Sequence, residues 1–287
     1  MYISLQNNLL TLKFNNMSLI SIITPVIDQM ESSHLKTQLL KYFPQQEEQF
    51  SKIEASFQAL TAQKQHQDAL NLFFKSWSQT NNSAMTVAGL SNRMTMIIHK
   101  NKEVKSEYDL FRAVSSLNRI VDEDLAVVGR VLHSKLFYDM ATSIAGDDSW
   151  LSNRYLSQQA IDFKAWKDKN SLRNKDIMIG LLTTLVHEIY THGEVEFIIP
   201  LFRKWLEDEG RLSDLEIDKA LAWIQVHCGP TEKDHFFHAV ASVASYAKAF
   251  EVNIEEYDLQ EIIEDYLQLK SEVMGVLHEE LLKEYAV

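Results

Sequence analysis

The chain has 287 residues, of which 46% are hydrophobic, and it contains only 8 glycines and 4 prolines. This is enough apolar material for a substantial core, and the scarcity of turn-forming residues argues against sandwiches and barrels of short strands. A formal net charge of −12 opposes binding to a phosphate backbone. The sequence has no basic stripe interleaved with aromatic residues, so we expect no nucleic-acid partner.

The single cysteine, the lengths of the apolar runs and the N-terminal residues indicate the cellular compartment in which we expect the protein. Cys228 has no second cysteine to pair with, which is typical of a reducing cytoplasm. No apolar run is long enough for a membrane span, so we expect no membrane association. Residues 1–16 lack the features of a secretory signal, and the first clear helical pattern begins after Met17. We interpret residues 1–16 as a disordered N-terminal extension.

Helical periodicity covers nearly all of the remaining chain, and no segment has a convincing strand pattern. The expected helical segments are, in order, 18–42, 46–78, 83–99, 106–145, 149–167, 172–208, 214–228, a segment from 231, and 256–283. Charged residues at 101–105 read as a loop, and Gly146 to Ser149 read as a turn and helix cap. The pattern predicts an all-α protein built as an up-and-down helical bundle.

The first candidate functional residue is Glu123. It lies in a segment whose other residues, such as Ile120, Val121 and Leu125, are typical of a buried helix. A carboxylate in apolar surroundings is costly unless it is paired or binds a metal. His133 follows ten residues later. The alternative interpretation is that the three acids at 122–124 form a solvated helix face.

A second candidate is Glu196, which precedes the strongly apolar run 197–202. Pro200 is expected to kink this helix, because its ring clashes with the carbonyl group of Glu196. The alternative is that Glu196 is an ordinary surface charge.

The third candidate is the cluster from His227 to His235. Glu232 and His235 are three residues apart, so they share one helix face. His227 lies before a Gly229-Pro230 break and converges with them only if the break rotates the chain. On a straight helix the alternative ligands Asp234 and His238 align better with His227, so spacing alone does not select the ligands.

Taken together, these segments place acids and imidazoles on three helices in apolar surroundings. Mixed oxygen and nitrogen ligands suit iron or manganese, and helical bundles build two-metal sites from such side chains on facing helices. We therefore expect a carboxylate/histidine metal centre.

The order of these motifs resembles the haem-oxygenase-like di-iron oxidases and oxygenases, which share their fold with TenA, PqqC and CADD. In that group the first core helix offers a Glu and a His, the second offers a Glu, and the third offers a His-x3-Asp-x2-His motif. Glu123 and His133 are similar to the first pair, Glu196 to the second-helix acid, and His227 and His235 to the outer members of the third motif. Thr231 stands where the family has its Asp, so Glu232 or Asp234 would have to replace it.

The resemblance implies one haem-oxygenase-like helical domain over residues 17–287. It implies two iron ions, with manganese as an alternative metal, held by Glu123, His133, Glu196, His227, Glu232 and His235. The departure at Thr231 leaves a site with one ion, or with none, open. The implied reaction is activation of O2 to oxidise a small molecule such as an amino acid, an amine or a fatty-acid-like substrate. A homodimer is common in the group, and the oligomeric state stays open.

Two other functions remain open at this stage. The first is a cofactor-free enzyme resembling TenA or PqqC, for which Cys228 is the one candidate nucleophile in the chain. The second is a non-catalytic helical binding protein, since the acidic surface and the Met-rich segment 85–96 would also suit a partner-binding face.

Overall fold

The computed structural model describes residues 17–81, 83–100, 104–126, 131–210 and 212–283. The described residues form α-helices joined by short 3₁₀ turns and one π-helical segment, without a strand among them, so the all-α prediction is confirmed. The helices are α2 Leu19–Ile27, α3 His34–Tyr42, α4 Glu47–Ala62, α5 Gln67–Thr80, α6 Ala84–Lys100, α7 Glu107–Asp124, α8 His133–Ala145, α9 Gln158–Asp168, α10 Ile177–Glu209, α11 Asp214–Ala220, α12 Ala222–His227, α13 Pro230–Phe250 and α14 Leu259–Leu281. The extension expected at residues 1–16 lies outside the described residues.

Several expected segments divide into two helices. The segment 18–42 separates into α2 and α3, and 106–145 separates into α7 and α8, with residues 127–130 of the connection outside the described part. The segment 214–228 separates into α11 and α12, because the backbone at Leu221 departs from helical geometry, with φ of −90° and ψ of 4°. No described helix is long and apolar enough to cross a membrane.

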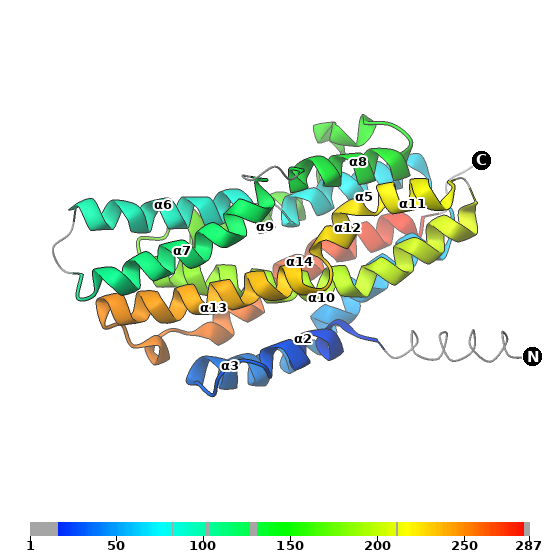
Figure 1. Cartoon of the computed structure of the whole chain (residues 1–287). Coiled ribbons are helices and arrows are strands. Elements are labelled where there is room, and N and C mark those ends of the chain that lie inside the picture. Colours follow the sequence, from blue (N-terminus) through cyan, green and yellow to red (C-terminus); the bar gives the residue numbers. More distant parts are fainter. Residues whose placement is uncertain (1–16, 82, 101–103, 127–130, 211, 284–287) are drawn as a thin grey trace, which may run out of the picture.

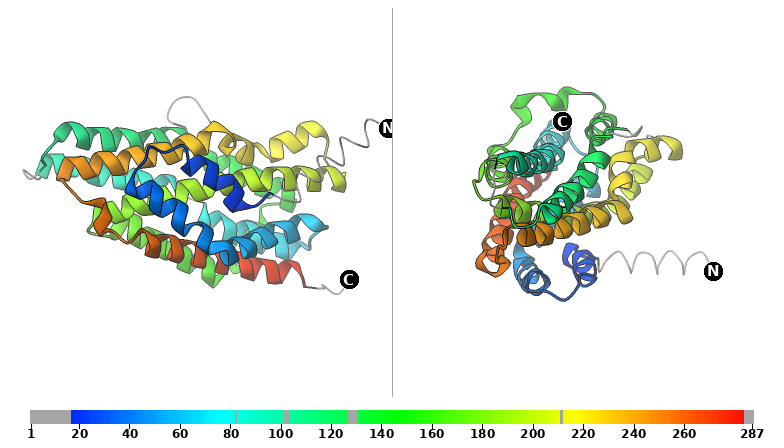
Figure 2. Two further views of the ribbon diagram at one scale, coloured as in Figure 1. Left: turned by 90° about the horizontal axis from the view of Figure 1, so that it is seen from below. Right: turned by 60° about the vertical axis from the view of Figure 1, so that its left-hand side comes forward.

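The long helix α10 is the centre of the bundle. It is buried on nearly all sides for most of its length, and α13, α14, α4 and α2 all pack against it. Helix α13 also packs along α7, so that α7, α13 and α10 lie side by side (Figure 1). Helices α2 and α3 lie on the outside of this arrangement (Figure 2). Gly193 allows α2 to approach α10, since a Cβ there would lie 2.7 Å from Ile23.

The turn between α12 and α13 depends on glycine. Gly229 has a φ of +70°, a region that side chains other than glycine rarely adopt. Pro230 then occupies the first turn of α13, where its missing N–H is not needed. The helix thus begins one residue before Thr231, the start expected from the sequence, and the turn changes the direction of the chain between His227 and Glu232.

Candidate metal centre

Two groups of three metal-binding side chains lie inside the bundle. Asp124, His133 and His227 form the first cluster, and Glu188, Glu232 and His235 form the second cluster. Within each cluster the donor atoms lie within 4.8 Å of one another. Five of the six residues are buried, and His133 is half-buried. The residues come from α7, α8, α10, α12 and α13, so the site exists only in the folded chain.

The first cluster uses two helix ends. Asp124 is the last residue of α7, and His133 is the first residue of α8. The His133 Nδ1 atom lies 3.0 Å from Asp124 Oδ1. The rings of His133 and His227 meet edge to face with centroids 4.5 Å apart. These two helix ends, together with His227 at the end of α12, therefore bring an acid and two imidazoles to one point.

A backbone hydrogen bond orients His227. Its Nδ1 donates to the carbonyl oxygen of Trp223, 2.6 Å away, which leaves Nε2 as the free nitrogen of the neutral ring. Nε2 lies 3.6 Å from Glu232 Oε1. Proteins commonly orient a metal-binding histidine in this way, with a hydrogen bond from the ring nitrogen that does not bind the metal.

The carboxylate of Glu232 joins the two clusters. Its Oε1 faces His227, while its Oε2 lies 3.6 Å from His235 Nδ1. The same His235 Nδ1 lies 3.7 Å from Glu188 Oε2. One oxygen of Glu232 thus faces each cluster, so this carboxylate could contribute to a cation in either one.

Three buried atoms of the second cluster lack a hydrogen-bond partner among the described residues. They are Glu188 Oε1, Glu232 Oε2 and His235 Nδ1. An unpaired buried polar atom costs roughly 1–3 kcal/mol, and three in one place are unusual unless a ligand satisfies them. Their oxygen and nitrogen donors suit a transition-metal ion, so the residues present fit the metal that the motifs imply.

Mutual electrostatics shifts the pKa values of these groups in the metal-free protein. Burial, together with the neighbouring Glu232, raises the pKa of Glu188 well above its usual value. Burial alone would lower the pKa of His235, but the charges of Glu232, Glu188 and Asp124 outweigh it and raise the pKa to about 10. Burial lowers the pKa of His227. The acids therefore favour cationic occupancy of the second cluster, by a proton or by a metal.

Glu123 lies at the edge of the site. Its Oε2 is 3.1 Å from His235 Nε2, on the far side of the ring from Glu188 and Glu232. Its side chain is 35% exposed, whereas those of Glu188 and Glu232 are nearly inaccessible. From this position the carboxylate can accept the Nε2 hydrogen and hold the ring with Nδ1 toward the cluster.

Of the residues expected from the sequence, the structure brings His133, His227, Glu232 and His235 together, with Glu123 beside them. Glu196 is in neither cluster, because its Oε1 accepts the backbone N–H of Gly229 and so holds the α12–α13 turn. Asp234 is exposed on α13, and His238 lies one turn beyond His235, outside both clusters.

Sequence reasoning did not single out Asp124 or Glu188. Asp124 could have been predicted from helical spacing, because it continues the buried face of α7. The buried residues of that face are Leu110, Ala113, Leu117, Ile120 and Asp124. An acid that continues an apolar stripe is a better candidate than the adjacent Glu123, which lies off it. Glu188 had a weaker signal, since α10 is buried all round and periodicity does not separate its faces.

A pocket of about 580 Å³ opens beside the first cluster. It is lined by Glu123, Val131, His133, Leu136, Ala222, Gln225, Val226, Cys228 and Thr231. The walls combine aliphatic groups with a few polar ones, as small-molecule sites commonly do.

No protein-family model and no curated protein matches the chain by sequence. The solved structures include a similar one, a TenA homolog from Pseudomonas syringae pv. tomato str. DC3000. It superposes with a TM-score of 0.52 at 9% identity, over 82% of this chain and 91% of that chain. The chain therefore has a TenA-like, haem-oxygenase-like fold, and inside that fold it carries two adjacent groups of residues able to hold metal ions.

Proposed function

We propose that this protein is a non-haem di-iron oxidase or oxygenase that activates O2 to oxidise a small molecule. The observation that carries the proposal is the placement of Glu232 between two buried clusters, beside unpartnered atoms of Glu188 and His235. A stability-only role does not account for such a group of acids and imidazoles in a core, because each costs free energy to bury.

In this proposal Asp124, His133 and His227 would hold one ion, Glu188 and His235 would hold the other, and Glu232 would contribute to both sites. Three carboxylates would offset much of the charge of two Fe(II) ions, and three imidazoles would complete a mixed nitrogen and oxygen donor set. Bound iron would supply the electrons and the open coordination positions that reaction with O2 requires.

Residues of the protein would orient the histidines, exclude water and admit the substrate. Glu123 keeps His235 oriented, and the backbone carbonyl group of Trp223 does the same for His227. The rings of Phe137 and Trp223 pack with centroids 5.0 Å apart, and both are buried, so they keep water from the inner side of the first cluster. The 580 Å³ pocket would admit the organic substrate next to His133 and Glu123.

The test is anaerobic titration with Fe(II), followed by exposure to O2. We expect uptake of two irons per chain and an absorbance transient on mixing with O2. A Glu232→Gln variant should bind fewer ions, while Asp234→Asn, which alters an exposed acid on the same helix, should bind two. Absence of iron uptake by the wild-type protein would refute the proposal.

A cofactor-free enzyme on the same fold is the second candidate, because Cys228 lines the pocket. Burial, with the nearby acids Glu196 and Glu232, raises the pKa of its thiol to about 12, whereas a nucleophilic cysteine needs a lowered pKa. The Sγ atom is also positioned to donate to the carbonyl oxygen of Val195, 3.6 Å away. Alkylation of Cys228 at neutral pH as fast as that of a free thiol would favour this second function.

A further inference from the structure

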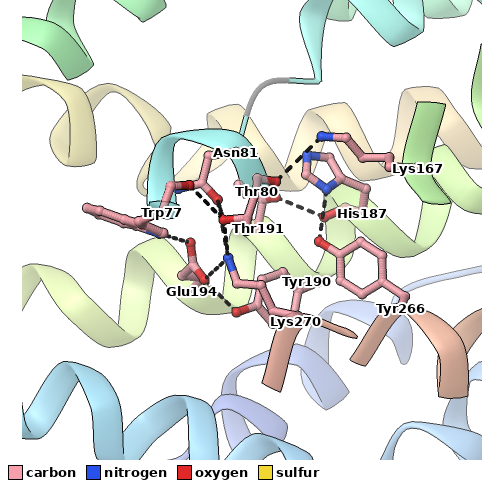
Figure 3. A network of polar contacts seen from close by, with 10 residues as sticks. All are labelled: Trp77, Thr80, Asn81, Lys167, His187, Tyr190, Thr191, Glu194, Tyr266 and Lys270. Atoms are coloured by element: carbon pink, nitrogen blue, oxygen red, sulfur yellow. Dashed lines mark hydrogen bonds and ion pairs between the residues drawn. The ribbon is translucent and has the colours of Figure 1, made fainter. Parts of the chain in front are cut away.

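A second buried polar group surrounds Glu194, with side chains from α5, α10 and α14 (Figure 3). Its centre is the ion pair between Lys270 and Glu194, which are 2.8 Å apart and fully buried. Trp77 Nε1 donates to Glu194 Oε1 at 2.9 Å, and Tyr190 donates its hydroxyl to Glu194 Oε2. None of these residues lines the pocket or belongs to either metal cluster, so the proposed function leaves them without a role.

Aromatic rings connect this group to the candidate metal centre. Trp77 meets Trp223 edge to face, with ring centroids 5.3 Å apart. Trp223 in turn lies 4.8 Å from the ring of His227, a member of the first cluster. The three rings make one continuous contact path from Glu194 to the first cluster.

The path continues in the opposite direction to the surface. The rings of Tyr190 and Tyr266 have centroids 5.3 Å apart, and the next ring, Trp166, lies 6.1 Å from Tyr266. Trp166 donates its Nε1 hydrogen to the exposed Asp265. All five tryptophans lie in the described part of the chain, and Trp166 is the one that is not buried.

Both tyrosines have a proton acceptor in place. Tyr190 donates to the Glu194 carboxylate, and the Tyr266 hydroxyl lies 2.9 Å from His187 Nδ1 (Figure 3). Tryptophan and tyrosine are the side chains most readily oxidised by one electron, and a tyrosine gives up its electron far more easily when a base takes the phenolic proton. A hydrogen-bonded phenol is already arranged for that transfer.

We propose that Trp223, Trp77, Tyr190, Tyr266 and Trp166 form a one-electron transfer chain between the metal centre and the surface. The inference rests on the proposed oxidative function. It gives the centre a route by which an oxidising equivalent left without substrate is carried away from His133 and His227, instead of damaging them.

In the iron-loaded protein one electron would pass from Tyr190 through Trp77 and Trp223 to the oxidised centre. The phenolic O–H bond of Tyr190 breaks, the proton moves to Glu194, and a neutral tyrosyl radical remains. A one-electron reductant of the thiol or ascorbate class then donates an electron at Trp166. That electron passes through Tyr266 to Tyr190, which takes the proton back from Glu194.

The outer half of the chain is testable without metal. Azide radicals generated by pulse radiolysis oxidise accessible tryptophan in the metal-free protein. We expect the tryptophan radical absorbance to decay at a rate independent of protein concentration while tyrosyl absorbance rises. Tyr266→Phe should abolish this conversion, and Tyr108→Phe, which alters a surface tyrosine that is 71% exposed, should retain it. Absence of the conversion in the wild type, or its persistence in Tyr266→Phe, would overturn the proposal.

The inner half requires the metal. Protein loaded with Fe(II) is mixed with O2 without substrate, frozen, and examined by electron paramagnetic resonance. We expect a tyrosyl signal that narrows with ring-deuterated tyrosine and is lost in Tyr190→Phe. Trp223→Phe gives a second interruption of the path, and thermal unfolding shows whether either variant is folded.

The outcomes separate the two proposals. Failure to take up iron refutes the proposed function. It also refutes the electron-transfer chain, because there is then no metal centre for it to serve. Iron uptake and O2 consumption without a tyrosyl radical refute the transfer chain alone. If Tyr190→Phe and Trp223→Phe are both folded and both keep the tyrosyl signal, the electron-transfer chain is likewise refuted. A network with a purely structural role would give that result.

Discussion

Glu188→Gln has opposite expected effects on stability with and without metal. In the metal-free protein this substitution removes an acid that burial and the neighbouring Glu232 already disfavour in its ionised form. The amide has nearly the same shape and loses only a group whose Oε1 has no hydrogen-bond partner among the described residues. We therefore expect unchanged or higher stability without metal, since replacing one of several packed acids relieves repulsion.

With metal present, Glu188→Gln is expected to lower the stability of the protein. At a free metal concentration of about 100 times the dissociation constant, binding stabilises the native state by about 2.7 kcal/mol. Loss of a group close to the metal weakens affinity by at least about 10- to 100-fold. At the 100-fold limit the remaining stabilisation is about 0.4 kcal/mol. At about 2–4 °C per kcal/mol for a chain of this size, the metal-induced rise in Tm should shrink by about 5–9 °C.

The assay is anaerobic thermal unfolding followed by circular dichroism, with and without Fe(II), for wild type, Glu188→Gln and Asp234→Asn. Asp234 is the matched control, because it is an exposed acid of α13 that lies outside both clusters. Its replacement should change Tm little in either condition and leave the metal-induced rise intact. If Glu188→Gln instead lowers Tm equally with and without metal, Glu188 is a structural hydrogen-bonding group and the reasoning fails.

Three further predictions concern protons, a buried lysine and the α12–α13 turn. Because the metal-free protein holds the pKa of His235 at about 10, metal must displace a proton. Affinity should fall as pH decreases below that value, with protons released on binding, as calorimetry in buffers of different ionisation enthalpy would detect. Burial lowers the pKa of Lys167 from 10.5 to about 7, so between these values the unfolded chain binds more protons than the folded one, and stability rises with pH. Lys167→Met should therefore stabilise most at pH 7, by at most about 5 kcal/mol, and least near pH 10.5, as urea unfolding at both pH values would show. Gly229→Ala should cost roughly 1–3 kcal/mol, because the combination of φ +70° and ψ −124° is adopted almost only by glycine. It should also weaken metal binding by moving His227 away from Glu232. An unchanged metal affinity in a destabilised Gly229→Ala protein would show that the turn does not position the site.

Much of the fold was readable from local pattern. The apolar spacing of α7, the break at Gly229-Pro230 and the turn that begins at Gly146 all appear where the sequence indicates them. These features depend on residues a few positions apart, so a single sequence contains them. The division of 106–145 into two helices was missed, because apolar side chains continue through the connection and hide the end of α7.

The candidate site was predictable only in part. His227, Glu232 and His235 are close in sequence, so the break and the shared face of α13 indicated their convergence. Glu196 was the expected acid of the central helix because it stands at the edge of an apolar run, yet its carboxylate binds the Gly229 amide. Glu188, two turns earlier, was hidden by a helix that is apolar all round.

What the sequence determined by itself was the helical class, most helix positions and the residue types of the candidate metal centre. The tertiary structure decided which acids reach it. Helix periodicity specifies the face on which a side chain lies but not the depth and rotation at which two helices pack. Those follow from side-chain packing along the whole of α7, α10 and α13, and they bring Asp124 and Glu188 within reach of histidines far away in the chain.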